Sequence, residues 1–488
     1  MNLLKLFKQE LLRYRFMLKP FFILTFIYCL ALSTIIRANF YYRDDLARTV
    51  LGYRDWSPWS RYISEYLSIV IHTDRLLMDI SPLTQLLGAV MIALASVILI
   101  YVFTEREKYT VWNMLAVLPL GIAPYFLQCW SYKFDAPYMA LSVLASIFPF
   151  LFVRYGNKYY FITSVIGCLI MCMTYQASSG IYVIVTLFLA AKKFNEGEPC
   201  LKFIATSALS YIGSLEFFRL LLMHERNVYA TTDIAPLHDL LKVVGNNIQI
   251  YFQLIHSDFH KVWQFLIVLL AIAFVCSFIA NSSLKKYQAC IMSLLVLVLG
   301  GILSFGGFIL LEKPLFGPRG MYGIGVFLTL LSINVTILSK YVFVKLISVL
   351  LSWCFFTFSF AYGNALAEQL RYTDFRINLL VNDLNHLQPL NKETMLMQLE
   401  GNIGRSPVIT RNFQKRYPVI RKLVPTTFAG GSNSLDSYYL FNYFDLPKIK
   451  RFVPTKKENF KNYNLPVVIN SRTHIIKADS KRILVELK

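Results

Sequence analysis

Long apolar runs alternate with short polar segments over the first 361 residues of the chain. A helix that crosses a membrane needs about 20 mostly apolar residues, with a usual range of about 17 to 25. The pattern therefore predicts eleven spanning helices, of which the segment 178–191 is the shortest. Their predicted bounds are 20–36, 83–103, 110–128, 137–153, 159–175, 178–191, 201–222, 262–280, 289–310, 320–338 and 343–361. We expect an α-helical polytopic membrane protein.

The first 19 residues carry a different pattern, with apolar and basic positions interleaved at helical spacing. Leu3, Leu4, Phe7 and Leu11 would share one face, and lysines and arginines lie between them. This pattern is typical of an amphipathic helix on a membrane surface. A basic anchor for the first span would have the same residues, and both interpretations place the N-terminus in the cytoplasm.

Basic residues recur in alternate short loops between the predicted spans. These residues are Arg106, Lys108, Arg154, Lys158, Lys192, Lys193, Lys285, Lys286 and Lys340. Cytoplasmic loops of membrane proteins are enriched in lysine and arginine, so we assign these loops to the cytoplasmic face. The segment 37–82, the loop 223–261 and everything after residue 361 would then lie on the outer face.

The segment 362–488 has no spanning run, and it carries 20 Lys and Arg against 10 Asp and Glu. It has helix-like text at 364–400, strand-like pieces at Tyr417–Leu423 and Arg482–Leu487, and turn signals at Gly430 and Gly431. Its many aromatic and branched residues argue against a disordered basic tail. A small α+β domain outside the membrane is therefore predicted.

Composition supports the membrane class and changes the interpretation of the charge. Hydrophobic residues make up 56% of the 488 residues and charged residues 16%, whereas soluble domains have roughly 25% charged residues. The formal net charge of +21 would suggest nucleic acid in a soluble protein. In a membrane protein the bases lie mostly in loops beside anionic lipid, so membrane lipid is an expected partner and nucleic acid is not.

The sequence carries no cofactor signature. It has no phosphate-binding loop, no dinucleotide fingerprint and no nucleophile elbow. The eight cysteines show neither metal-like nor disulfide-like spacing. His256 and His260 are spaced like metal ligands, but no third ligand of matching quality lies near them. We expect no metal site, and a divalent metal is left as an option that nothing in the sequence indicates.

The stretch 37–61, which directly follows the first predicted span, holds two adjacent carboxylates, Asp44 and Asp45. Neighbouring carboxylates tend to push one pKa upward, and a raised pKa suits a general base near neutral pH. The alternative is a turn or a helix cap held by Arg43 and Arg48. The sequence does not decide which of the two aspartates would act as the base.

Aromatic residues beside these charges favour a substrate site over a simple cap. Trp56, Trp59 and Arg61 follow the acidic pair closely. Aromatic faces next to charged groups commonly hold sugars and lipid headgroups. The segment after Arg61, with the sequence YISEYLSIVIH, predicts a short helix at the membrane interface that would enclose one side of the site.

Two further outer turns carry candidate residues. Lys133 and Asp135 lie in the tight turn QCWSYKFDAPY, where ionisable residues are functional candidates unless they satisfy one another locally. Tyr175 and Gln176 end another outward span, and a tyrosine there also fits the ordinary aromatic belt of a membrane protein.

The turn LEKPLFGPRGMYG places Glu312, Lys313 and Arg319 on the outer face, against the general distribution of basic residues. A cation at that position needs an anion. The phosphate of a lipid-linked substrate would serve, and so would an ordinary phospholipid. We favour a substrate role for Arg319.

The ordered segments FYYRDDLARTVLGYRDWSPWSRYISEYLS, SYKFDAPY, TYQAS and GPRG resemble the phage-encoded serotype-converting O-antigen glucosyltransferases of Gram-negative bacteria. The resemblance covers most of the membrane part and implies a GT-C-like membrane fold. It also implies an enzyme of the bacterial inner membrane that takes a glucosyl residue from a polyprenyl (undecaprenyl) phosphate donor. The expected acceptor is the O-antigen of lipopolysaccharide on the periplasmic face.

This resemblance assigns roles to some of the candidate residues. It makes Asp44 or Asp45 the base for an acceptor hydroxyl. It also makes Arg48, Lys133 and Arg319 the ligands of the carrier phosphate. Because such enzymes need no covalent intermediate if the anomeric configuration inverts, one base would be sufficient.

The resemblance also implies a division of the chain. Residues 1–19 would be a cytoplasmic amphipathic segment, and residues 20–361 the transmembrane transferase with its outer catalytic loop at 37–82. Residues 362–488 would form a periplasmic C-terminal domain. The family often has glycine where this chain has Ser60, and this difference affects only the conformation expected of the local turn.

Two other functions fit parts of the sequence. A transporter or flippase of a lipid-linked sugar would be expected to show ionisable or broken-helix positions near mid-membrane and related halves, and neither pattern is present. A non-catalytic scaffold would use its basic C-terminal segment to bind an anionic partner.

Overall fold

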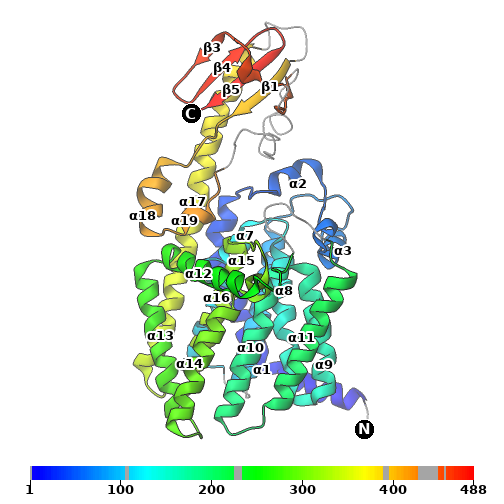
Figure 1. The fold of residues 1–488 in the computed structure, drawn as a ribbon, viewed down its shortest axis with the longest axis vertical. Helices are drawn as coiled ribbons and strands as arrows, with labels where there is room; N and C mark the ends of the chain where they lie inside the picture. The colour runs from blue at the N-terminus through cyan, green and yellow to red at the C-terminus, as the bar shows by residue number, and fades with distance from the viewer. Residues whose placement is uncertain (1–2, 105–108, 225–232, 388–394, 427–448, 456–457) are drawn as a thin grey trace.

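Helices form one bundle, and a small sheet stands at one end of it, on the extension of the last helix (Figure 1). The computed structural model describes residues 3–104, 109–224, 233–387, 395–426, 449–455 and 458–488. Within these ranges seven helices are long and apolar enough to cross a membrane. The chain is therefore a mostly helical membrane protein with a small C-terminal sheet.

These seven helices coincide with seven of the predicted spans. Two of them join a 3₁₀ segment to an α-helix. The elements are α1 (Leu3–Ala38), α4 (Leu83–Thr104), α8 with η2 (Ala136–Ile147 and Phe148–Tyr155), η3 with α10 (Gln176–Ser178 and Ser179–Asn195), α13 (Lys261–Ala280), α14 (Lys286–Leu303) and α17 (Val342–Leu387).

The other four predicted spans are helical but are not among the seven. α9 (Asn157–Thr174) and α11 (Leu201–Leu221) are continuous helices, and α16 (Gly323–Leu338) has 16 residues. The predicted span at 110–128 is broken into shorter pieces, so the prediction of a single continuous helix there was wrong. The total of eleven spans stays a prediction.

The broken segment lies inside the bundle. Its pieces are α5 (Val111–Ala116), α6 (Pro119–Ile122) and α7 (Leu127–Ser131), and every residue from 116 to 140 is buried. Irregular backbone is tolerated at membrane depth where protein surrounds it, because protein groups can then satisfy its polar atoms. The indole of Trp130, for example, donates a 2.7 Å hydrogen bond to the carbonyl of Gly121. This enclosed segment leads into the turn that carries Lys133 and Asp135.

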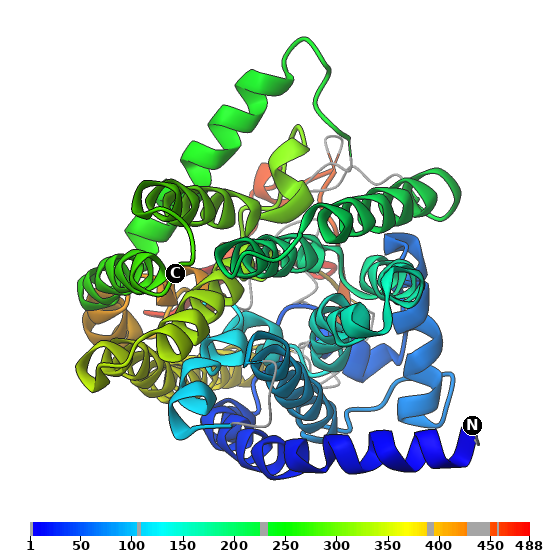
Figure 2. The same ribbon diagram turned by 90° about the horizontal axis from the view of Figure 1, so that it is seen from below.

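The predicted N-terminal segment and the first predicted span form one helix, α1. Pro20 lies inside it, where a proline removes one helical hydrogen bond and bends the axis. In Figure 2 the start of α1 extends sideways past the other helices. Over the described residues, which begin at Leu3, the N-terminal segment therefore continues into the first span without a break.

Loops that carry basic residues meet at the end of the bundle away from the sheet (Figure 1). The backbone N–H of Ser283 donates to the carbonyl of Asn195 at 3.1 Å, which joins the loop after α10 to the loop after α13. Asn281 donates to the carbonyl of Leu338 at 2.9 Å, which adds the end of α16. The predicted loop residues Arg106 and Lys108 lie outside the described residues. The grouping agrees with one face for the basic loops.

Short elements cover the opposite end of the bundle. The helix expected from the text YISEYLSIVIH is confirmed as α3. The elements at this end are the longer helix α12 (Leu240–Asp258) and the short elements α2 (Asp45–Leu51), η1 (Ser57–Trp59), α3 (Tyr62–His72), η4 (Gly306–Leu310) and α15 (Pro318–Met321).

Five strands form the sheet, in the order β2-β1-β5-β4-β3. β1 runs parallel to β2 and β5, and β4 runs antiparallel to β5 and β3. The strands are β1 (Met395–Glu400), β2 (Ile449–Arg451), β3 (Val467–Asn470), β4 (His474–Ala478) and β5 (Arg482–Leu487). One face packs on Ile377, Leu380 and Leu384 of α17.

The C-terminal predictions are partly confirmed. The strand at Arg482–Leu487 is confirmed as β5. The strand at Tyr417–Leu423 was wrong, because Ile420–Leu423 forms the short helix α19, which follows α18 (Gln414–Arg416) and the π-helical η6 (Ile409–Phe413). The helix expected over 364–400 ends at Leu387, and its last six residues are β1. Gly430 and Gly431 lie outside the described residues.

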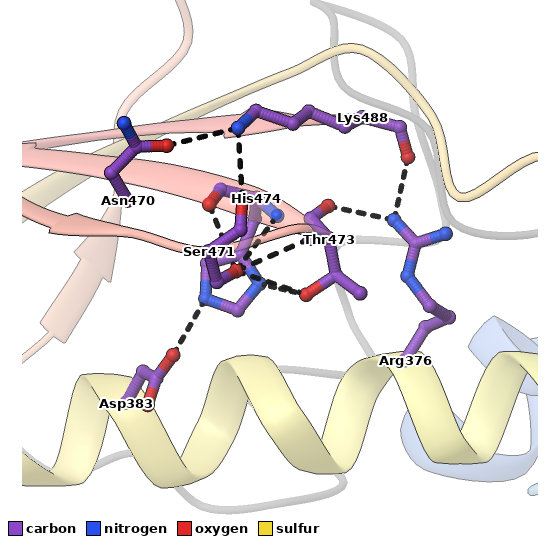
Figure 3. Close-up of polar contacts among 7 residues, drawn as sticks. All are labelled: Arg376, Asp383, Asn470, Ser471, Thr473, His474 and Lys488. Atoms are coloured by element: carbon purple, nitrogen blue, oxygen red, sulfur yellow. Dashed lines mark hydrogen bonds and ion pairs between the residues drawn. The ribbon is translucent and has the colours of Figure 1, made fainter.

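Polar side chains of α17 hold the sheet (Figure 3). Arg376 donates to the backbone carbonyls of Thr473 at 2.7 Å and Lys488 at 2.6 Å. Nε2 of His474, which is 1% exposed, lies 2.9 Å from a carboxylate oxygen of Asp383. Because α17 also spans the bundle, it passes through the predicted domain boundary at 361/362 without a break.

A second connection joins the C-terminal part to the bundle. The carboxylate of Asp258, at the end of α12, accepts hydrogen bonds from Lys422 and from the hydroxyl of Tyr125, each at 2.7 Å. The backbone N–H of Val419 donates to the carbonyl of Asp258 at 3.2 Å. The carbonyl of Leu423 in turn accepts a 2.8 Å hydrogen bond from the hydroxyl of Tyr42 in the outer loop. The segment around α19 is thus fixed beside the loop 37–61.

The packing of His474 predicts a pH-dependent attachment of the sheet. Burial lowers the pKa of His474, and Asp383 opposes that shift only in part. A pKa that is lower in the folded than in the unfolded chain means that the folded sheet favours neutral His474. The packing of His474 therefore stabilises the sheet fully above about pH 6.5, and this stabilisation is lost as pH falls through the folded pKa. Hydrogen exchange of β4, corrected for its intrinsic pH dependence, should be faster at acidic pH than at neutral pH. A His474→Gln variant should lose this difference, and an unchanged difference would contradict the prediction.

Candidate functional site

The loop between α1 and α4 has several residues in an uncommon backbone conformation. We call this loop, residues 37–82, the outer loop after its predicted side of the membrane. Among the described residues, every non-glycine residue with a positive φ lies between positions 39 and 73. They are Asn39, Arg43, Asp55, Ser60 and Thr73, with φ between 47° and 58°. Such conformations are uncommon for non-glycine residues and often gather at functional sites. Ser60 adopts the left-handed conformation at φ 58°, so the turn that a glycine would favour forms with serine.

Asp45 is the buried member of the acidic pair. Its side chain is fully enclosed, and Oδ2 accepts hydrogen bonds from the backbone N–H groups of Tyr42 and Lys133, each at 3.0 Å. Burial raises the pKa of Asp45 well above its usual range, although the two N–H donors oppose the shift. Asp45 therefore joins the outer loop to the turn before α8.

Asp44 is only half-buried and caps α2 by position. Its side chain makes no capping hydrogen bond, so the cap interpretation does not explain that side chain. Burial raises the pKa of Asp44, the charge of Asp135 raises it further, and the charges of Arg48 and Arg319 lower it. Asp44 thus lies in the combined field of three of the predicted site residues. An accessible carboxylate with a raised pKa suits proton transfer near neutral pH.

Arg48 and Asp135 form a buried pair beside it. Nη1 of Arg48 lies 3.3 Å from Oδ2 of Asp135. The indole of Trp56 donates to Oδ1 of Asp135 at 2.5 Å, and its ring lies under the guanidinium of Arg48 at 4.1 Å. Trp56 therefore holds both charged groups in place.

Lys133 is close to Asp45 through its backbone, but its ammonium group has other partners. Nζ lies 2.7 Å from a carboxylate oxygen of Asp79 and 2.6 Å from Oδ1 of Asn39, over the ring of Tyr41. Burial alone would raise the pKa of Asp79, but hydrogen bonds from Lys133 and Ser81 hold it below its usual range. The sequence analysis missed Asp79, because it lies 54 residues away from Lys133 along the chain.

Arg319 enters the site from α15. Its guanidinium donates to the hydroxyl of Tyr132 at 2.6 Å, and its backbone N–H donates to Oε1 of Gln128 at 2.6 Å. Nε2 of Gln128 donates to the hydroxyl of Tyr42 at 2.8 Å. Gln128, which the sequence analysis missed, thus connects α15 to the outer loop. Its position within a predicted apolar span was the available signal.

The aromatic and amide candidates form a third part of the same end. The guanidinium of Arg61 lies 4.6 Å from the ring centroid of Tyr175, and its Nε donates to Gln176 at 3.4 Å. Gln176 donates to the carbonyl of Trp59 at 3.2 Å. The hydroxyl of Tyr175 donates to the carbonyl of Arg319 at 3.3 Å. These contacts join four predicted residues from two distant segments, and Tyr175 connects them to Arg319.

Glu312 does not join this cluster. Its side chain is exposed, and among the described residues no hydrogen bond or ion pair connects that side chain to the site. Its backbone N–H donates to the carbonyl of Asp233, which fixes the loop before α12. The two ends of the predicted turn 311–323 thus have different partners: Glu312 contacts the loop before α12, and Arg319 contacts Gln128 and Tyr132.

A cavity of about 260 Å³ lies next to Lys133. The end of α1, the start of α4 and the middle of α17 enclose it, together with the turn after α7. Its lining includes polar groups of Asn39, Ser81, Gln85 and Lys133. In the part of the chain that the structure describes, no three His, Cys, Asp or Glu side chains are grouped as metal ligands.

A comparison with protein-family models identifies one family. A family model described as glucosyl transferase GtrII matches residues 33–330, which contain all the site residues named above. A Salmonella phage P22 protein described as an uncharacterized 55.3 kDa protein in the gtrB 5′ region is 23% identical over 413 residues. The match covers 79% of this chain and 82% of that protein. No solved structure matches at a significant level.

The two aspartates should differ in their effect on folding. Asp45→Ala removes the acceptor of two buried backbone N–H groups, at a cost of about 1–3 kcal/mol for each unsatisfied donor. Asp44→Ala leaves those bonds intact. Thermal unfolding of the purified chain in detergent should show a clearly lower Tm for Asp45→Ala than for Asp44→Ala. Equal Tm values for the two variants would contradict the structural role of Asp45.

Proposed function

The chain belongs to the glucosyl transferase GtrII family, and on this premise we propose its donor, its acceptor and its catalytic groups. The donor is a polyprenyl phosphate that carries glucose, and the acceptor is the O-antigen of lipopolysaccharide. Transfer takes place at the periplasmic face of the inner membrane and changes the serotype of the cell. The field of Arg48, Asp135 and Arg319 around the half-buried Asp44 carries this proposal.

Asp44 is the general base in this proposal. The acceptor hydroxyl oxygen attacks the anomeric carbon of glucose while its proton passes to a carboxylate oxygen of Asp44. The bond between that carbon and the phosphate oxygen breaks, and its electron pair leaves with the phosphate. A single base is sufficient if the configuration inverts. Asp45 holds the backbone that positions Asp44, because one of its carboxylate oxygens accepts two backbone N–H groups and the whole side chain is enclosed.

Arg319 and Arg48 stabilise the departing phosphate. Positive groups placed where negative charge grows lower the barrier most effectively in a site that excludes water. Both guanidinium groups act on the pKa of Asp44, which supports their placement around one reaction centre. Lys133, expected earlier as a phosphate ligand, is left out because its ammonium group is held by both Asp79 at 2.7 Å and Asn39 at 2.6 Å. Arg48 is also paired, with Asp135 at 3.3 Å, but among the described residues its buried Nε has no hydrogen-bond acceptor and can still serve the phosphate.

Arg61, Trp59, Tyr175 and Gln176 border the same centre and supply an aromatic face and amide groups for sugar hydroxyls. Residues 362–488 help to position the polymeric acceptor, since α17 and the α19 segment join them to the outer loop. The N-terminus and the basic loops then lie in the cytoplasm.

A transporter of a lipid-linked sugar is the second candidate. Transporters bind their substrate near the bilayer midplane, between related halves. The charged cluster here lies instead with the short elements at one end of the bundle, on the side of the sheet (Figure 1). That location favours transfer at a membrane surface over transport through the bundle.

Asp44→Asn should reduce glucosyl transfer by about 10²- to 10⁴-fold, the usual contribution of a general base. Membranes with labelled polyprenyl phosphoglucose and lipopolysaccharide would report the transfer. Asp74→Asn, an exposed aspartate in the same outer loop, is the matched control and should keep full activity. Full transfer by Asp44→Asn would exclude its role as the base.

The pH profile of kcat/KM should reveal the raised pKa of Asp44. The base must be ionised, so activity falls as pH drops below that pKa, and the acid limb should lie above the value of about 4 for an ordinary aspartate. Asp135→Asn removes a charge that raises the pKa of Asp44 and should move the limb to lower pH. A limb that does not move would contradict the assignment.

Arg319→Gln should lower kcat/KM for the lipid donor by about ten- to hundredfold, the loss of a hydrogen bond to a charged group. Arg75→Gln, at an exposed arginine in the outer loop, is the control. Initial rates at varied donor concentration give the comparison. An Arg319→Gln enzyme as efficient as the control would remove Arg319 from the phosphate site.

A further inference from the structure

The cavity beside Lys133 is lined by polar groups, and one of them, the amide of Gln85, is not fully used in hydrogen bonds within the described residues. Gln85 is only 4% exposed, and its Oε1 accepts a 3.3 Å hydrogen bond from the hydroxyl of Thr84. In the described part of the chain its Nε2 amide has no acceptor, although the residue lines the cavity. The amide is therefore free to donate a hydrogen bond to a group that enters the cavity.

The charge of the cavity is almost neutral. The ammonium group of Lys133 lies 2.7 Å from Asp79 and 2.6 Å from the amide oxygen of Asn39. A phosphate group placed there would approach the carboxylate of Asp79 and gain little from a lysine whose charge is already offset. The charges of Arg48 and Arg319, by contrast, act on Asp44, whose pKa they lower. The cavity beside Lys133 therefore suits a neutral ligand better than a phosphate.

A neutral sugar fits the groups that line the cavity. Sugar hydroxyls both donate and accept hydrogen bonds, and so they can pair with amides, with hydroxyls and with a fixed lysine–carboxylate pair. Ile35, Ile36 and Leu366 supply an apolar wall for the C–H face of a ring. The volume of about 260 Å³ is slightly below the about 300 Å³ at which sites for drug-sized ligands begin. It therefore suits one ring and not a longer oligosaccharide.

We propose that this cavity binds one neutral pyranose unit of a saccharide substrate, and that the unit is separate from the phosphate held by the arginines. The inference rests on the proposed transferase function. The backbone N–H of Lys133 donates to Asp45, and Asp44 precedes Asp45 in the chain, so this hydrogen bond connects the lining of the cavity to the segment that carries the proposed base. Gln85, Asn39 and Lys133 contact its hydroxyl groups. The ring belongs either to the acceptor or to the donor.

Binding is tested on the purified full-length chain in lipid nanodiscs. Saturation-transfer NMR with methyl α-D-glucopyranoside, and separately with glycerol phosphate, reports contact without any need for turnover. Ile36→Trp fills the cavity, and Leu30→Trp places the same side chain at a 43% exposed position of α1. We expect the pyranoside signal to disappear in Ile36→Trp and to persist in Leu30→Trp. A signal that is absent in the wild type, or equal in both variants, overturns the proposal, and so does a glycerol phosphate signal that Ile36→Trp removes.

Kinetics of a gentler variant identify the substrate. Gln85→Leu keeps the size of the side chain and removes the amide, so KM for one saccharide substrate should rise about tenfold, the loss of one hydrogen bond. A higher KM for the O-antigen assigns the ring to the acceptor, and a higher KM for the lipid donor assigns it to glucose. Unchanged values for both substrates overturn the inference. If the wild type binds the pyranoside in the Ile36-dependent manner but transfers no glucose, the cavity assignment stands and the proposed function fails.

Discussion

The buried carboxylate of Asp45 is the interaction on which the arrangement of the outer end depends. One oxygen accepts the backbone N–H groups of Tyr42 and Lys133, which come from the loop after α1 and the turn before α8. Because the group lies out of water, the loss of either bond leaves a buried N–H without a partner. The position of Asp44, the preceding residue, follows from this fixed junction. A strong local constraint therefore places a partly exposed carboxylate at this end of the bundle.

The same junction is extended by a chain of hydrogen bonds. The hydroxyl of Tyr42 donates to the carbonyl of Leu423 and accepts from Gln128, whose amide oxygen accepts the backbone N–H of Arg319. These bonds connect the C-terminal segment, the outer loop and α15. The ion pair of the buried Asp258 with the partly exposed Lys422 fixes the C-terminal segment from the other side. The region after the membrane part is thus continuous with the site through direct contacts.

The charges at this end are divided between two environments. Lys133 and Asp79 offset one another beside a cavity with amide and hydroxyl groups, whereas Arg48 and Arg319 act on Asp44 together with Asp135. The first environment has no net charge, and the second sets two arginines against two carboxylates. A sugar ring and the phosphate attached to it would therefore meet different groups, amides and hydroxyls in the cavity and the guanidinium groups of Arg48 and Arg319.

The sequence by itself determined the membrane class, most helix positions, the short helix after Arg61 and the residues that gather at the outer end. Those features follow from local periodicity and from the cost of burying charge in lipid, which act along the chain. Only the tertiary structure decided which aspartate is enclosed, that Lys133 pairs with Asp79, that Glu312 stays outside, and that Tyr417–Leu423 is not a strand. Each of these depends on partners from distant segments, and residue patterns along one segment carry no information about such partners.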